Sequence, residues 1–194
     1  MKKFLFSIFI SAGLCANAQE AEFGLLAFIS GNRTRADNAS AANSWRDWGR
    51  SSRIWGSYVR FYVSEKWAIQ PELLLVRYSG ELNDTASFLL NYIALPVLGR
   101  LEFTPKIFVS AGPQLAVLAS GIKEHGDKKE DYKRIYASWL FGAGYVFQEL
   151  GLEVSLRYEL GLSDLHESDG IKAFMNTFRL VLSYRLAGGR PIFR

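Results

Sequence analysis

The sequence predicts an all-β protein, a single eight-stranded antiparallel up-and-down transmembrane β-barrel. Three observations predict this class. A leader typical of exported proteins opens the chain of 194 residues, hydrophobicity then alternates with a period of two, and the connections between the alternating segments are short and long in turn. A period of two is the pattern of strands with two different faces, and alternating connection lengths are typical of outer-membrane barrels.

The leader has the three parts of a secretory signal peptide. Two lysines precede an apolar stretch over 4–14, which is too short to span a bilayer, and a small-x-small run ends at Ala18. We therefore expect a signal peptide over 1–18 and an outer-membrane β-barrel domain over 19–194; an N-terminal anchor helix is the alternative. The only cysteine, Cys15, lies in this leader, so the mature chain is expected to have no disulfide and no thiol chemistry.

Eight segments carry the alternating pattern. It is clearest near the end of the chain, where Leu152, Val154 and Leu156 alternate with Glu153, Ser155 and Arg157. Leu180 and Leu182 are expected to face lipid together with these three apolar residues. The predicted strands are 21–30, 53–63, 67–78, 88–103, 107–119, 135–147, 151–161 and 174–186. Lengths near ten residues suit a tilted bilayer crossing and an OmpA/OmpX-like architecture.

The connections divide into two sets. Tight turns are expected at 64–66, 104–106 and 148–150, and longer polar loops at 31–52, 79–87, 120–134 and 162–173. An even number of strands puts both chain ends on the short-turn side, which is the periplasmic side in barrels of this kind.

A soluble lipocalin-like ligand-binding barrel is the alternative fold, because alternation alone does not say which face is inside. Aromatic residues near strand ends favour the membrane barrel, since such barrels carry aromatic girdles at both interfaces. These aromatics are Trp55, Trp67, Phe103, Trp139, Phe147 and Phe174. Three prolines, Pro71, Pro96 and Pro113, argue against it, because each removes a ladder donor. We expect bulges or shifted strand boundaries at the prolines.

Charged side chains on the less apolar face predict a network inside the barrel. An eight-stranded barrel is just wide enough inside for side chains, so we expect a plug of ion pairs; a narrow conduction path is the alternative. The network is expected to contain Glu72, Arg100, Glu102, Arg157, Glu159 and Arg179, with Glu153, Arg185 and Arg60 on the same face.

Several runs resemble the PorT-like family of outer-membrane β-barrel domains. They are Gln70-Pro71-Glu72-Leu73-Leu74, residues 90–98, Val109-Ser110-Ala111-Gly112-Pro113, residues 141–145 and residues 156–162. The resemblance covers most of the mature chain and implies that the three prolines are tolerated. Ala94 stands where the family often has a glutamate. The founding member is associated with secretion, so the resemblance also implies a secretion-related role.

No recognisable enzyme site is present in the sequence. His125 and His166 both lie in polar, charge-mixed loops, and His166 is followed by Ser168 and Asp169. A catalytic triad or a metal centre needs convergent geometry that such proximity does not provide. The sequence therefore predicts no catalytic residue, no metal and no cofactor, and the weakly basic balance of +4 gives no case for nucleic-acid binding.

The predicted role is structural or interactive, with a lipid A-modifying enzyme as the alternative. The expected partners are outer-membrane lipid, lipopolysaccharide and an unidentified protein. The longest loop contains Trp45, Arg46, Trp48 and Arg50. Tryptophan supplies apolar contact area and arginine grips phosphate or carboxylate, so these four residues are candidates for an outer-loop contact. Packing on the barrel rim is the other interpretation.

Overall fold

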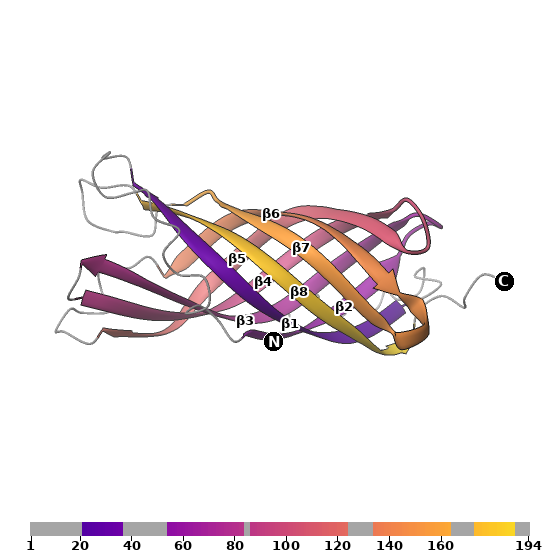
Figure 1. The fold of residues 1–194 in the computed structure, drawn as a ribbon, viewed down its shortest axis with the longest axis horizontal. Coiled ribbons are helices and arrows are strands. Elements are labelled where there is room, and N and C mark those ends of the chain that lie inside the picture. Colours follow the sequence, from indigo (N-terminus) through magenta and orange to yellow (C-terminus); the bar gives the residue numbers. More distant parts are fainter. Residues whose placement is uncertain (1–20, 37–53, 84–85, 124–133, 164–172, 189–194) are drawn as a thin grey trace, which may run out of the picture.

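Eight antiparallel strands close into one barrel in the order of the sequence (Figure 1). The computed structural model describes residues 21–36, 54–83, 86–123, 134–163 and 173–188. The strands are β1 (Ala21–Ala36), β2 (Ile54–Tyr62), β3 (Trp67–Asn83), β4 (Ala86–Glu102), β5 (Ile107–Lys123), β6 (Ile135–Phe147), β7 (Leu152–Gly161) and β8 (Ala173–Gly188). The predicted fold class is confirmed.

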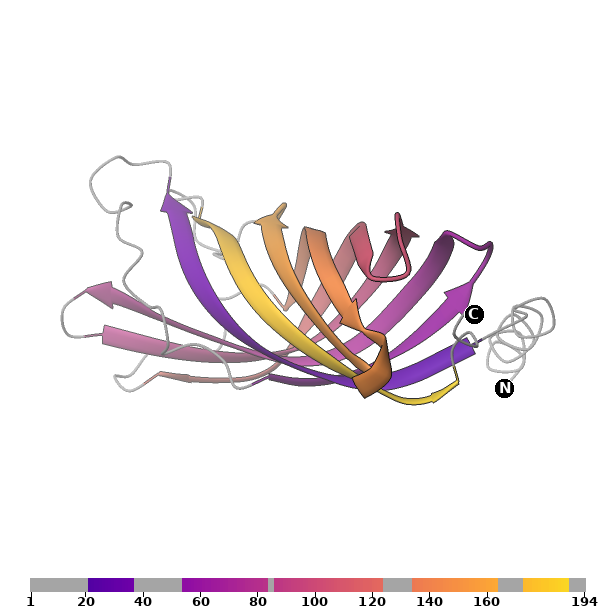
Figure 2. The ribbon, with the colours of Figure 1, turned by 45° about the vertical axis from the view of Figure 1, so that its right-hand side comes forward.

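The short connections lie together at one end of the barrel, where β1 also begins and β8 ends (Figures 1 and 2). The connection between β6 and β7 is a single 3-10 turn, η2 (Gln148–Leu150), followed by Gly151 with φ 64°. That left-handed backbone favours glycine. Within the described residues, no helix is long and apolar enough to cross a membrane.

Several strands run further from this end than the sequence predicted. β3 and β4 stay paired as far as Asn83 and Ala86, so the predicted loop over 79–87 is wrong, and β1 continues through 31–36 as a partner of β8. The predicted loop over 120–134 likewise begins later, because β5 reaches Lys123. Beyond the bilayer neither face of a strand needs to be apolar, so the alternation in hydropathy ends there. The hydrogen bonds between backbones do not depend on hydropathy, so pairing continues.

The outer face of the barrel is apolar and the inner face is polar or mixed. Leu156 and Leu180 are directly paired across β7 and β8, and their side chains are 55% and 46% exposed, whereas the intervening Arg157 and Arg179 are buried. A soluble ligand-binding barrel would show the reverse arrangement, so the lipocalin-like alternative is wrong. Aromatic residues near the strand ends, including Trp55, Trp67, Phe103 and Phe147, are exposed on the outside.

The three prolines interrupt the ladder without shifting it. Pro71 pairs with Val97 of β4 but not with β2, and Pro96 and Pro113 likewise pair only with the strand that follows them. The register is the same on both sides of each interruption, so the expectation of bulges or shifted boundaries there is wrong. Each missing donor affects only the adjoining part of one ladder. Register shifts occur elsewhere, at Phe23/Gly24, Glu81/Asn83 and Asn91/Tyr92.

The interruption at Pro113 brings two backbones close together. A Cβ built on Gly112 would lie 2.0 Å from the carbonyl oxygen of Val97. Glycine is therefore required at this position, because any side chain would collide with the backbone of β4.

Candidate functional site

Glu153 of β7 forms the centre of the charge network inside the barrel. Its carboxylate accepts hydrogen bonds from Arg60 of β2, with Nη1–Oε1 at 2.7 Å and Nη2–Oε2 at 2.9 Å. Arg100 of β4 donates to the same two oxygens, with Nη1–Oε2 at 2.8 Å and Nη2–Oε1 at 3.2 Å. Charge-assisted bidentate pairs are among the strongest polar contacts in proteins, so this junction ties β7 to two strands that are not its neighbours in the sheet.

The two arginines have further partners on their own side of the lumen. Arg60 donates to Glu22 Oε1 at 2.6 Å and to Gln70 Oε1 at 2.8 Å. Arg100 donates to Glu102 Oε1 at 3.0 Å, and its guanidinium carbon lies 3.5 Å from the centre of the Phe108 ring. Each guanidinium is therefore supported by carboxylates and by a second polar or aromatic group, as a buried charge requires.

The network continues from Gln70 towards the middle of the barrel. Gln70 Nε2 donates to Glu72 Oε1 at 2.6 Å, and Arg157 Nη1 donates to Glu72 Oε2 at 2.7 Å. Glu72 and Arg157 belong to β3 and β7, so this is another link across the lumen. Arg157 lies directly opposite Arg179 in the ladder, and like charges in that position repel each other. The pair is compatible with the fold because each arginine has a glutamate partner.

That partner of Arg179 is Glu159, in a second buried cluster. Glu159 accepts hydrogen bonds from Arg179, from Gln114 Nε2 at 2.7 Å and from Ser138 Oγ at 2.7 Å. Among the side chains that the structure describes, four buried arginines face four buried glutamates: Arg60, Arg100, Arg157, Arg179, Glu22, Glu72, Glu153 and Glu159. Formal charges therefore cancel in this described part of the buried lumen. Removing one member leaves an uncompensated charge, which is the costly change in a buried network.

An apolar cluster fills another part of the same lumen. Inward side chains from several strands pack together there, and the rings of Tyr92 and Tyr136 lie 6.4 Å apart between centres. The buried members are Leu26, Phe28, Tyr58, Leu74, Val76, Tyr92, Ala94, Ala116, Tyr136 and Val181. The interior is thus occupied by ion pairs and by packed apolar side chains, as the small diameter of an eight-stranded barrel requires.

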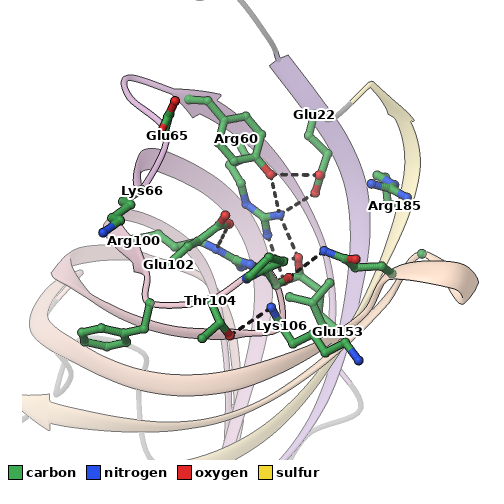
Figure 3. A pocket seen from close by; sticks show the side chains of 16 residues that line it. Glu22, Arg60, Glu65, Lys66, Arg100, Glu102, Thr104, Lys106, Glu153 and Arg185 are labelled. Atoms are coloured by element: carbon green, nitrogen blue, oxygen red, sulfur yellow. Dashed lines mark hydrogen bonds and ion pairs between the residues drawn. The ribbon is translucent and has the colours of Figure 1, made fainter. Parts of the chain in front are cut away.

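A cavity of about 490 Å³ lies at the short-turn end of the barrel. Figure 3 shows charged side chains around it, with Arg60, Arg100 and Glu153 at its inner end. Its wall also includes Lys66, Lys106 and Arg185. We call this cavity, together with the short turns that border it, the mouth.

The structure brings most of the sequence-predicted network residues together. Glu72, Arg100, Arg157, Glu159 and Arg179 are buried in the lumen. The side chain of Glu102 is 20% exposed and lies at the mouth. The predicted outer-loop contact, Trp45, Arg46, Trp48 and Arg50, lies outside the described residues.

Sequence reasoning missed several partners in the network. Glu22, Tyr58, Gln70, Gln114 and Ser138 are all buried and hydrogen-bonded. Glu22 shares the inner face of β1 with Leu26 and Phe28, so this strand shows no clean polar face in the sequence. The ladder pairs Glu22 directly with Arg60, and only this pairing identifies it as a network residue.

No group of three potential metal ligands occurs among the residues that the structure describes. His125, His166 and Ser168 lie outside those residues, as does the predicted signal peptide. The expectations of a cleaved leader and of a protein without catalytic activity therefore stay predictions.

A closed eight-stranded barrel with an apolar outer face and an ion-paired interior is the architecture of small outer-membrane barrel proteins. Comparison with known families agrees with this class. The family described as "Outer membrane protein beta-barrel domain" matches residues 17–167. The chain belongs to this family and is a protein of the outer membrane.

Solved structures of outer-membrane proteins are similar to this chain. Neisserial surface protein A is 12% identical with a TM-score of 0.54, over 86% of this chain and 99% of that chain. Ail of Yersinia pestis, solved with the heparin analogue sucrose octasulfate, is 18% identical with a TM-score of 0.46, over 87% of this chain and 100% of that chain. OprG of Pseudomonas aeruginosa is 9% identical with a TM-score of 0.45, over 88% and 98% of the two chains. No curated protein matches at a significant level.

Proposed function

We propose that this protein is a non-conducting outer-membrane barrel that acts by binding at its ends. The observation that carries the proposal is the occupied lumen. The junction of Arg60, Glu153 and Arg100 links opposite walls, and the apolar cluster fills a further part of the interior. In the part of the lumen that the structure describes, side chains paired and packed in this way oppose the passage of ions.

The first test of this proposal is electrical. The folded barrel, reconstituted in a planar bilayer, is expected to produce no discrete conductance steps, because the buried ion pairs would have to separate before an ion could pass. A general porin inserted in the same membrane is the positive control. Regular single-channel steps from the wild-type barrel would establish conduction and refute the proposal.

Binding on the long-loop side is assigned to the segment that contains Trp45, Arg46, Trp48 and Arg50. The outer leaflet presents anionic phosphosugars to this side, and arginine beside tryptophan combines phosphate binding with apolar contact. We infer that lipopolysaccharide or a protein partner is bound here. The PorT-like resemblance makes components of a secretion apparatus the first protein partners to test.

Replacing these four residues with alanine is expected to abolish binding to lipopolysaccharide or to the partner, while the folded band on an unboiled gel is retained. Binding is measured by co-sedimentation with lipopolysaccharide and by crosslinking in cells. The matched control replaces Lys128 and Lys129 with alanine, which removes the same number of cations from another polar segment. Loss of the folded band would instead assign the tryptophans to rim packing, and unchanged binding would refute the contact.

A further inference from the structure

The mouth is a preformed cavity, because hydrogen bonds tie its bordering turns together. The backbone N–H of Glu102 donates to the carbonyl of Lys66 at 2.8 Å, and that of Val146 donates to the carbonyl of Lys106 at 2.7 Å. Gln148 Nε2 adds a bond to the carbonyl of Pro105 at 2.8 Å. A site built in this way needs little ordering when a ligand enters.

At the inner end of the mouth, Arg60, Arg100 and Glu153 already have ion-pair partners. Arg60 and Arg100 both bind Glu153, and their remaining donors reach Glu22, Gln70 and Glu102. A ligand charge placed there would have to displace an existing ion pair. The inner end therefore supplies a rigid polar surface, and recognition of a charged ligand depends on the side chains nearer the opening.

Cations predominate near the opening. Lys66, Lys106 and Arg185 line the cavity, and no ion pair joins any of the three to the other residues that the structure describes. The full lining contains five cations, Arg60, Lys66, Arg100, Lys106 and Arg185, against four carboxylates, Glu22, Glu65, Glu102 and Glu153. A cavity with low-dielectric walls concentrates such an excess of positive potential.

We propose that the mouth binds the phosphate group of a small molecule that enters from the short-turn side, that Arg185 contacts this phosphate, and that Lys66 and Lys106 attract it from other sides of the opening. The three cations lie on different sides of the cavity (Figure 3), so the two lysines act through their positive potential while Arg185 makes the contact. A cavity with three such cations around it favours a doubly charged phosphate over a singly charged carboxylate, and the Arg185 guanidinium can form two parallel hydrogen bonds to phosphate oxygens. A volume of about 490 Å³ lies within the range of small-molecule sites.

This site is distinct from the long-loop contact, since it lies at the opposite end of the barrel. Its ligand has two possible sources that share the same chemistry. One is the headgroup of a phospholipid in the adjoining leaflet, and the other is a soluble phosphate ester in the compartment that the short turns face. The test therefore includes both.

The experiment uses the full mature chain folded in uncharged maltoside micelles and inorganic pyrophosphate as the probe. Amide resonances in ¹H–¹⁵N spectra at Lys106, Gly151 and Arg185 are expected to shift in a saturable manner. The Arg185→Gln variant is expected to weaken binding about tenfold, because it removes a charged hydrogen-bond donor. The matched control is Arg134→Gln, since Arg134 is exposed and directly precedes β6 at the long-loop end, and the affinity of this variant should equal that of the wild type.

Addition of phosphatidylglycerol to the micelles distinguishes the two sources. Shifts of the same resonances and competition with pyrophosphate would assign the site to a lipid headgroup, whereas an unchanged pyrophosphate affinity would assign it to a soluble ester; both results support a phosphate site. The proposal is overturned if pyrophosphate causes no saturable shift, or if R185Q and R134Q bind with the same affinity. Each variant must first show the folded band on an unboiled gel.

Discussion

Glu153→Gln is expected to destabilise the folded barrel by about 3 kcal/mol, at the lower end of the range for breaking a buried ion pair. The substitution keeps the size of the side chain and removes its charge. Arg60 retains Glu22 and Arg100 retains Glu102, so neither guanidinium loses every partner. The lumen nevertheless gains one uncompensated positive charge at the point where β7 is held to β2 and β4.

Urea unfolding in micelles, followed by tryptophan fluorescence, measures this effect. The matched control is Glu102→Gln, which removes the same kind of carboxylate from the same Arg100. Because the Glu102 side chain is 20% exposed and pairs with one arginine, its loss should cost about 1 kcal/mol or less. Equal urea midpoints of unfolding for the two variants would show that Glu153 contributes no more to stability than Glu102 does.

Leu180→Arg is expected to cost about 2–4 kcal/mol, the value for a cation placed on the lipid face near the bilayer midplane. Leu180 lies on the outer face of β8, directly opposite Leu156 of β7, and both side chains are exposed. An arginine there must bring its charge into hydrocarbon or bend away from it, and both responses oppose insertion.

Leu186→Arg provides a control on the same strand and the same face. Leu186 is also exposed but lies near the short-turn end of β8, where a cation reaches the interface and should cost about 0–1 kcal/mol. Folding into lipid vesicles at increasing urea concentration measures both variants. If they fold equally well, the barrel is not positioned in the bilayer as its outer face implies.

The strands that sequence reasoning placed best are those with different chemistry on their two faces. In β7 and β8, leucines alternate with charged residues, and the structure places the charges inside and the leucines outside. In β4, the inward Tyr92 and Leu98 alternate with the outward Ile93 and Val97. Both faces of that strand are apolar in the sequence. The packed cluster around Tyr92 could therefore not be distinguished from the lipid face by hydropathy.

The partners within the lumen depend on register, which a single sequence does not show. Glu153 and Arg60 are separated by 93 residues along the chain, and only closure of the barrel brings them together. The same limit explains the prolines. The positions of the prolines were visible in the sequence, whereas the ability of one ladder to lose a few bonds and resume in the same register depends on the neighbouring strands.

The seam between β1 and β8 has a consequence for the order of assembly. These two strands come from opposite ends of the chain and pair along nearly their whole lengths, from Glu22 with Gly188 to Ala36 with Ala173. A nascent chain that lacks β8 would leave β1 and β7 as open edges, and hydrocarbon provides no substitute for their missing hydrogen bonds. Closure must therefore wait until β8 has been synthesised, and the chain needs protection from aggregation until then.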